Sequence, residues 1–316
     1  MVFKKNNKEM GGFIEFYLQK TGEYHNKAYK INLARHSFNF LAKANNFKKL
    51  YIPKYISNTV YDNLNIPYEF YDIDENFYPI LDRLNSKKDA LVYVNYFGVN
   101  NNNVKKLIKK FPKIIIDNAH AFYNKINNQN ILYSARKFFG VSDGCYFYSK
   151  KKIKLDHFNE DLSYLNLIPL LKKIELGSNK SYLDYLNVES EFNKSKIKKM
   201  SLLTSKILNS IDYQSDIKHR LKSFKYLHSE LGKKNELSFS AYGDSVPMCY
   251  PFLNKKNNIS NLIKNKFYVP RYYKSSQKFF LKNSFENYLI NKLVCIPIHK
   301  NINRFDLKYI LNLINA

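Results

Sequence analysis

The sequence contains no tryptophan, only three cysteines, and nine each of glycine and proline among its 316 residues. Cys145, Cys249 and Cys295 are widely spaced and odd in number, which argues against a disulfide framework and against a cysteine-based zinc site. The scarcity of glycine and proline excludes collagen-like and low-complexity architectures. No apolar run approaches the ~20 residues that span a bilayer, and polar residues follow the first five instead of a signal-peptide stretch. We therefore expect a cytoplasmic protein without a membrane span.

Acidic residues are also scarce, with 26 Asp and Glu against 52 Lys and Arg, so the formal net charge is +26. Such a charge is compatible with nucleic acid, anionic membrane surfaces or phosphorylated substrates as partners. The alternative is codon bias, because Lys, Asn, Ile, Tyr and Phe share AT-rich codons and the lysines are spread over the whole chain. We favour codon bias and expect no nucleic-acid partner. The charge could still attract an anionic substrate.

Short apolar segments alternate with polar helical ones in the first half of the chain. With 45% hydrophobic residues, the chain can bury a sizeable core. Strands are expected at 49–53, 68–71, 89–96, 113–117 and 144–148, and helices at 57–64 and 104–110. Strands and helices in this alternation predict an α/β fold with a mainly parallel sheet, whose ligands gather beyond the carboxyl ends of the strands.

The pattern changes after about residue 160. Helices are expected at 189–208, 216–231, 257–265, 284–293 and 304–314, and strands at 247–252 and 267–270. We therefore divide the chain into a large domain, residues 1–205, and a smaller C-terminal α+β domain, residues 206–316.

Two segments suggest a chemistry. Residues 114–120 (IIIDNAH) place Asp117 at the end of an apolar strand, and residues 134–137 (SARK) place a hydroxyl three residues before Lys137. A pyridine cofactor that acts as an electron sink needs a carboxylate to keep its ring nitrogen protonated, and its aldehyde needs an amine. Asp117 and Lys137 could supply these groups, and Ser134 could bind a cofactor phosphate. Burial near positive charge would lower the pKa of the lysine from about 10.4.

Each of these residues also has a structural interpretation that needs no catalytic role. An aspartate at a strand end is often a turn or capping residue. A serine three residues before a lysine arises by chance in a lysine-rich chain, and His120 could be a polar residue at a helix start. The order of the residues along the predicted elements carries more weight than any one of them.

The chain resembles the DegT-like sugar aminotransferases, which are fold-type-I enzymes dependent on pyridoxal 5'-phosphate (PLP). The resemblance is carried by residues 89–98 (DALVYVNYFG), 113–122 (KIIIDNAHAF) and 134–144 (SARKFFGVSDG). Residues 247–253, 267–273 and 294–299 resemble the small-domain strands of that family, in the family's order. The resemblance spans most of the chain and implies an aspartate-aminotransferase-like large domain that binds PLP.

The resemblance also implies roles for single residues. Asp117 would pair with the pyridine nitrogen, and His120 would lie near the phenolic oxygen. Lys137 would hold the aldehyde as a Schiff base and act as the general base, with Ser134 as a phosphate ligand. The family's active site lies at a dimer interface, which implies a homodimer, and Asn179 would reach the partner's cofactor phosphate.

The sequence departs from the family pattern at one turn. Where the family has Ser-Gly-Thr or Ser-Gly-Arg, residues 32–36 read NLARH, so Arg35 is retained and Ala34 replaces the glycine. Backbone amides can still bind phosphate there, although a Cβ at Ala34 restricts its approach. Tyr55 is a candidate for stacking on the cofactor ring, but Ser57 falls nearer the expected place.

One aromatic cluster is open to two readings. Its residues either face the active site from the small domain or form a half-buried edge. They are Tyr268, Tyr272 and Tyr273, with Arg271 beside them.

The sequence is compatible with four functions. The first is an aminotransferase that moves an amino group from an amino acid, with glutamate the expected donor, to a nucleotide-linked keto sugar for surface polysaccharide synthesis. A related branch dehydrates sugars, but it carries histidine where this chain has Lys137. The altered turn at Ala34 favours a third candidate, a non-catalytic binding or regulatory relative. Charge alone favours the fourth, a nucleic-acid-binding protein. We expect the first.

Overall fold

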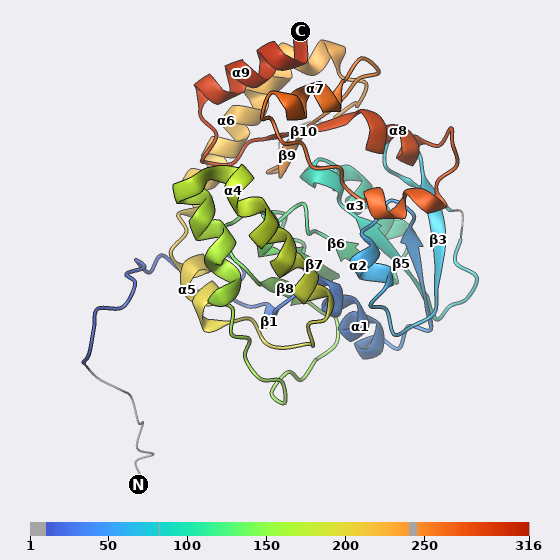
Figure 1. Ribbon diagram of the computed structural model, residues 1–316. Coiled ribbons are helices and arrows are strands. Elements are labelled where there is room, and N and C mark those ends of the chain that lie inside the picture. Colours follow the sequence, from blue (N-terminus) through green and yellow to red (C-terminus); the bar gives the residue numbers. More distant parts are fainter. Residues whose placement is uncertain (1–10, 82, 240–244, 316) are drawn as a thin grey trace.

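The computed structural model describes residues 11–81, 83–239 and 245–315. Its centre is an eight-stranded sheet in the order β1-β8-β7-β6-β5-β2-β3-β4 (Figure 1). The strands are β1 (Tyr29–Ile31), β2 (Lys49–Pro53), β3 (Tyr68–Ile73), β4 (Pro79–Ile80), β5 (Asp89–Val94), β6 (Ile114–Asp117), β7 (Asn130–Ser134) and β8 (Cys145–Tyr148). The expected α/β fold with a mainly parallel sheet is confirmed.

The directions of the strands determine where a ligand site can form. Strands β7, β6, β5, β2 and β3 are mutually parallel. Strand β8 runs antiparallel to both of its neighbours, β7 and β1, so β1 points the same way as β7. The carboxyl ends of β1, β5, β6 and β7 therefore meet at one edge of the sheet, where open α/β sheets bind ligands.

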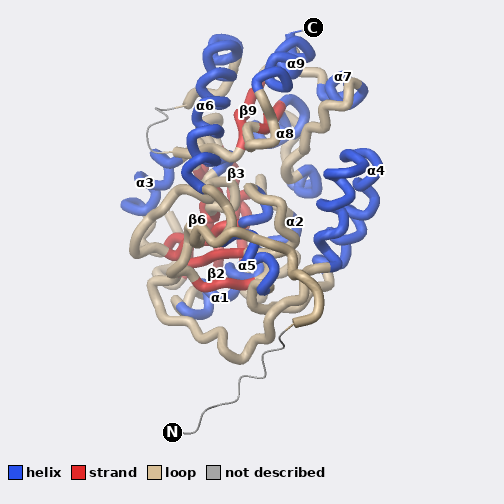
Figure 2. The backbone as a smooth tube through the Cα atoms, turned by 90° about the vertical axis from the view of Figure 1, so that its left-hand side faces the viewer, coloured by secondary structure: helices blue, strands red, loops and turns tan. Residues whose placement is uncertain are grey.

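Helices cover both faces of the sheet (Figures 1 and 2). Helix α1 packs on β7 and β8, and α3 packs on β6. The helices of the first two thirds of the chain are α1 (Ala34–Ala44), α2 (Asn58–Tyr61), α3 (Asn101–Lys110), α4 (Ile168–Asn193) and α5 (Leu202–Asn209). Every residue of β5 is buried, which fits its nearly continuous apolar sequence between two helical layers.

The C-terminal third gathers at one end of the molecule, at the top of Figure 1. A two-stranded antiparallel sheet pairs β9 with β10 there. The elements are α6 (Tyr213–Leu231), β9 (Cys249–Leu253), α7 (Ile259–Lys264), α8 (Phe285–Lys292), β10 (Leu293–Pro297) and α9 (Arg304–Asn315). The predicted domain boundary between residues 205 and 206 lies within α5 and stays a prediction.

Two expected elements are wrong. The single helix expected at 189–208 is the end of α4 followed, after a non-helical stretch, by α5. Ser201 starts the second helix because its hydroxyl accepts the Thr204 amide as an N-cap. The strand expected at 267–270 is an irregular segment, where Pro270 has no amide to donate to a ladder and Lys266 has a left-handed φ of 61°.

Among the described residues, no helix is both long and apolar enough to cross a membrane.

Candidate functional site

Three of the predicted site residues come from neighbouring strand ends. Asp117 is the last residue of β6 and pairs in register with Leu132 on β7. Two residues further along β7, Ser134 ends the strand and starts a short 3-10 turn, Ala135–Lys137. The structure therefore brings Asp117, Ser134 and Lys137 to the same edge of the sheet.

Asp117 is a buried carboxylate with little hydrogen bonding. Its Oδ1 accepts the amide of Ala119 at 2.9 Å. Burial raises the pKa of Asp117 to about 6, against the opposing effects of that hydrogen bond and of the positive charge of Lys137. A carboxylate with a raised pKa in such a position is suited to a cationic or protonated partner.

The Lys137 amine is surrounded by charges. Burial of the ammonium lowers the pKa of Lys137, and the charge of Arg136 lowers it further, while Glu189 and Asp117 oppose these effects. The residue as a whole nevertheless keeps much exposed surface. Its Nζ lies 5.3 Å from the centre of the Tyr272 ring. A lysine in these surroundings deprotonates more readily than one in water.

His120 sits in an aromatic stack beside these groups. Its ring stacks on Phe97 at 5.6 Å and lies nearly parallel to Tyr273 at 5.9 Å. The Phe97 amide donates to Nδ1 at 3.4 Å, and Nε2 lies 3.4 Å from the Tyr273 hydroxyl. Burial, with the charge of Lys137, holds the pKa of His120 well below its usual range. The ring is therefore neutral, and the hydrogen bond at Nδ1 assigns the proton to Nε2.

The turn after β5 fits closely against His120. Phe97 and Gly98 have left-handed φ values of 57° and 74°. A Cβ on Gly98 would stand 2.7 Å from the carbonyl oxygen of His120, so only glycine allows this approach. The Phe97 carbonyl accepts the Met248 amide at 2.9 Å, which ties the site to the C-terminal third of the chain.

Two guanidinium groups flank the lysine. Arg35, in the first turn of α1, donates to the side chain of Asn193 at 2.8 Å. Arg136 pairs with Glu189 and lies over the Phe192 ring, 4.4 Å from its centre, while its buried Nε has no hydrogen-bond partner among the described residues. Burial lowers the pKa of Arg35, and so does the charge of Arg136. Such a pair of guanidinium groups, one with a free donor, suits an anion such as phosphate.

The first turn of α1 adds backbone donors. Leu33 is the N-cap and makes no side-chain cap, and the first turn carries no acidic residue. The amides of Ala34 and Arg35 therefore face the end of the helix without a local acceptor, as at anion sites on helix N-termini. Ser134, whose hydroxyl does not cap its own turn, is buried at the neighbouring strand end.

The remaining predicted residues lie in different places. Tyr55 is buried and meets Tyr273 edge-on at 4.8 Å, so it belongs to the aromatic group around His120. Asn179 follows a kink in α4, where Gly177 has a φ of 78°, and accepts a hydrogen bond from Tyr268. Within the described chain, no contact joins Asn179 to Asp117 or Lys137.

Sequence reasoning left part of the site open. Tyr272 lies against the Lys137 amine and Tyr273 against the His120 ring, and both tyrosines are half-buried, so the contacts do not separate the two interpretations of the aromatic cluster. Arg136, Glu189 and Phe97 were not singled out. Arg136 could have been noticed as the neighbour of Lys137, whereas nothing in the sequence indicates that Glu189 returns to that turn.

Known structures share this architecture, although no family model and no curated protein sequence matches the chain. A DegT DnrJ EryC1 StrS aminotransferase from Brucella abortus has 12% identity and a TM-score of 0.57, over 91% of this chain and 85% of that one. The Streptococcus pneumoniae protein Spr1654 in its PLP form has 12% identity and a TM-score of 0.63, over 92% and 87%. A sugar aminotransferase from Micromonospora echinospora has 11% identity and a TM-score of 0.58, over 91% and 86%.

The chain therefore has the fold of these aminotransferases, and the fold expected from the resemblance is confirmed. At 11–12% identity the likeness establishes the fold, and the chemistry has to be argued from the residues of this chain.

Proposed function

We propose that the protein is a PLP-dependent aminotransferase that moves an amino group from an amino acid to the keto group of a sugar. The observation that carries the proposal is the placement of buried Asp117, at the end of β6, beside Lys137, just beyond the end of β7, where each charge acts on the pKa of the other. The similar structures, which are sugar aminotransferases and include one in a PLP form, support it.

The residues at the sheet edge fit the cofactor group by group. Asp117 would hold the proton on the ring nitrogen. Its pKa is raised because the carboxyl is buried, and a cationic ring beside it would offset that burial. His120 would donate from Nε2 to the phenolic oxygen. Arg35, Arg136 and Ser134, with the α1 amides, would hold the phosphate. Tyr55 lines the same aromatic group and would limit the movement of the ring.

PLP supplies an electron sink that acidifies the Cα–H of a bound amino acid. Lys137 would bond to its aldehyde and, once released by the amino donor, would move the proton between Cα and the cofactor. Its lowered pKa favours the free amine that this step needs. The Tyr272 ring, whose centre lies 5.3 Å from the amine, would border the cofactor on that side.

The finer assignments rest on charge and resemblance. We propose glutamate as the amino donor and a nucleotide-linked keto sugar, destined for surface polysaccharide, as the acceptor. The net charge of +26 would favour a diphosphate-bearing substrate. We also place the reaction in the cytoplasm, because Cys145, Cys249 and Cys295 are all unpaired.

We further propose a homodimer that covers an apolar surface on and before α4, here called the α4 patch. Its large apolar side chains are exposed, with Ile174 at 82% and Leu183 at 73%. The patch consists of Leu162, Tyr164, Leu165, Ile168, Leu171, Ile174, Leu176, Tyr182, Leu183, Tyr185 and Leu186. Large apolar side chains exposed in this number along one segment indicate an interface. A second copy would also give Asn179, on the same helix, a route to the partner's cofactor phosphate.

An absorption titration tests the proposal. Purified protein mixed with PLP should develop the band of a PLP–lysine linkage, and glutamate should replace it with the band of the aminated cofactor while 2-oxoglutarate appears. Borohydride reduction and peptide mapping should place the pyridoxyl group on Lys137. Lys137→Ala should abolish the linkage, whereas the control Lys150→Ala should not.

A pyridoxyl group on a different lysine would refute the assignment of Lys137. A wild-type chain that binds no PLP at saturating concentration would refute the enzyme and favour the non-catalytic relative, for which the glycine-free turn at Ala34 is the supporting observation.

A further inference from the structure

The turn before α1 is held by a side chain. Asn32, which follows β1, is completely buried. Its backbone amide donates to the Lys198 carbonyl at 3.0 Å, and its carbonyl accepts the Gly144 amide at 2.7 Å. Its side-chain Oδ1 accepts the amides of Leu33 at 3.0 Å and Lys198 at 3.3 Å. Asn32 is therefore fixed by both its backbone and its carboxamide.

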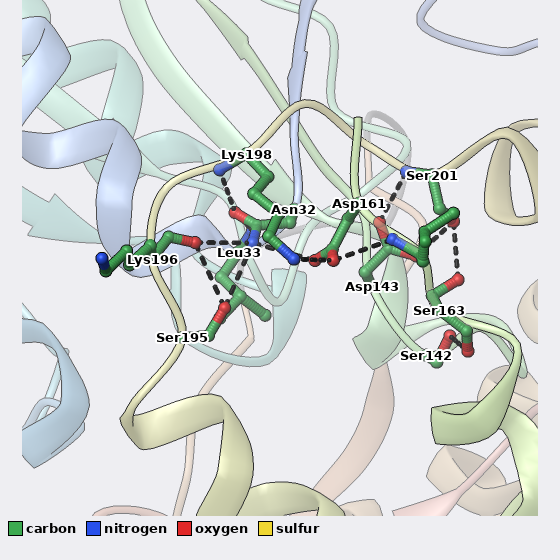
Figure 3. Close-up of polar contacts among 11 residues, drawn as sticks. Asn32, Leu33, Ser142, Asp143, Asp161, Ser163, Ser195, Lys196, Lys198 and Ser201 are labelled. Carbon is green, nitrogen blue, oxygen red and sulfur yellow. Dashed lines mark hydrogen bonds and ion pairs between the residues drawn. The ribbon is translucent and has the colours of Figure 1, made fainter. Parts of the chain in front are cut away.

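The other end of the carboxamide is equally occupied. The Nδ2 of Asn32 lies 3.0 Å from Asp161 Oδ2, 3.3 Å from Ser195 Oγ and 3.0 Å from the Lys196 carbonyl. Figure 3 shows the Asn32 side chain between the 195–198 segment and Asp161. The second oxygen of Asp161 pairs with Lys198 Nζ at 2.8 Å, so the acceptor is itself held in place.

A second layer anchors this arrangement to α5. Asp143 precedes Gly144, whose amide bonds Asn32, and it accepts the amide and the hydroxyl of Ser201, both at 2.8 Å (Figure 3). It also accepts the hydroxyl of Thr204. Gly144 has a φ of 119°, and a Cβ there would press on Thr204 at 3.0 Å. The turn is thus connected to α5 through the buried hydrogen bonds of Gly144 and Asp143.

The turn before α1, residues 32–36, contains no glycine, so hydrogen bonds have to hold its backbone in one orientation. Leu33 has ordinary extended angles, φ −128° and ψ 137°, so the backbone alone does not aim the amides of Ala34 and Arg35. In a buried site, donors held in place before a ligand arrives cost no reorganisation when it binds. The Asn32 carboxamide supplies this fixation, since it bonds the residue next to Ala34 directly.

We propose that Asn32 is the residue that positions the first turn of α1 for the phosphate group of the cofactor, an inference that rests on the proposed function. Asn32 itself would not touch the phosphate. It acts through the amides of Ala34 and Arg35, which do.

The test compares the affinity for PLP with the affinity for pyridoxal, the same aldehyde without the phosphate. The Asn32→Asp side chain keeps the size of asparagine and the oxygen that accepts hydrogen bonds. It loses the Nδ2 donor, so it places a carboxylate against the carboxylate of Asp161. It should weaken PLP binding about 10- to 100-fold, as expected for misaligned hydrogen bonds to a charged group, and pyridoxal binding by less than about threefold. The double variant Asn32→Asp/Asp161→Asn restores a donor–acceptor pair and should recover most of the loss.

Asn130→Asp serves as the matched control, because Asn130 is another buried asparagine, at the amino end of β7 and away from the site edge. It should leave the ratio of the two affinities unchanged. Equal weakening of PLP and pyridoxal in Asn32→Asp, or an unchanged ratio, would overturn the positioning role. If Asn32→Asp does not fold, a double variant with the wild-type ratio supports the role and one with a lowered ratio overturns it. A wild-type chain that binds neither aldehyde would instead refute the proposed function.

Discussion

Replacement of Asp117 by asparagine should change how the stability of the cofactor-free protein depends on pH. The pKa of this carboxyl rises from 3.8 to about 6 because it is buried. The folded chain therefore holds this proton more tightly than the unfolded chain does. The stabilisation by the protonated group is complete below about pH 3.8 and is lost as the pH rises through about 6. The carboxamide in the Asp117→Asn variant has no proton to lose, so the variant should not show this loss.

The size of the effect follows from the shift. A rise of about two units corresponds to about 3 kcal/mol at 1.36 kcal/mol per unit. The Asp117→Asn variant would also bury an amide donor, at a cost of about 1–3 kcal/mol if it stays unpaired. The absolute difference at one pH is therefore less informative than its change with pH. Relative to wild type, the variant should gain about 2–3 kcal/mol of unfolding free energy between pH 4 and pH 7.5.

Urea unfolding of both proteins without PLP, at intervals across this range, measures the change. The exposed Asp156 provides a control, and Asp156→Asn should track wild type at every pH. A difference between Asp117→Asn and wild type that stays constant across the range would refute the burial argument. Added PLP should stabilise wild type, because its ring would supply the positive partner, and should stabilise Asp117→Asn much less.

Three further predictions test other parts of the site. Gly98→Ala should lower the unfolding free energy by about 2 kcal/mol or more, because it strains a left-handed φ and presses on the His120 carbonyl. Gly140→Ala, whose added Cβ meets open space, should leave the unfolding free energy unchanged. Equal urea midpoints for the two variants would contradict the close approach at Gly98. Glu189→Gln should lower the pH at which half of Lys137 reacts with an amine-directed acylating reagent, and Arg136→Gln should raise it, because the two charges shift the pKa of Lys137 in opposite directions. Mass spectrometry of the peptides measures acylation at Lys137, and shifts of the same sign in both variants would refute this effect of the charges. The double variant Ile174→Glu/Leu183→Glu should convert the dimer to a monomer in sedimentation experiments, whereas the control Ile80→Glu, on β4, should remain a dimer. A wild-type protein that sediments as a monomer would rule out the α4 patch as an interface between two copies of the chain.

Much of the sheet could be predicted because its strands carry their signal locally. The strand expected at 49–53 is β2 with the same bounds, and the buried run at 89–96 is β5 with two residues less. Strand β1, only three residues long, was missed because its partner β8 lies more than a hundred residues away. Helix α1 begins without a side-chain cap, so the usual sequence sign of a helix start is absent there.

The chemistry at the sheet edge could be predicted only in part. The strand ends and the order of motifs pointed to Asp117 and Lys137 together. The approach of Glu189 to the turn that bears Lys137, and of Tyr272 and Tyr273 to His120, depends on packing between distant segments. Such contacts leave no periodic trace in a sequence.

The bond between Asn32 and Lys198 has a consequence for the order of folding, since it joins residues 166 positions apart. Contacts of such long separation form late, because the loop between them must be closed before they contribute. On the ribosome, the strand ends with Asp117 and Lys137 emerge well before Lys198 does. A nascent chain could therefore have Asp117 and Lys137 in place while the turn before α1 is not yet fixed. Cofactor capture would then be among the last steps of maturation.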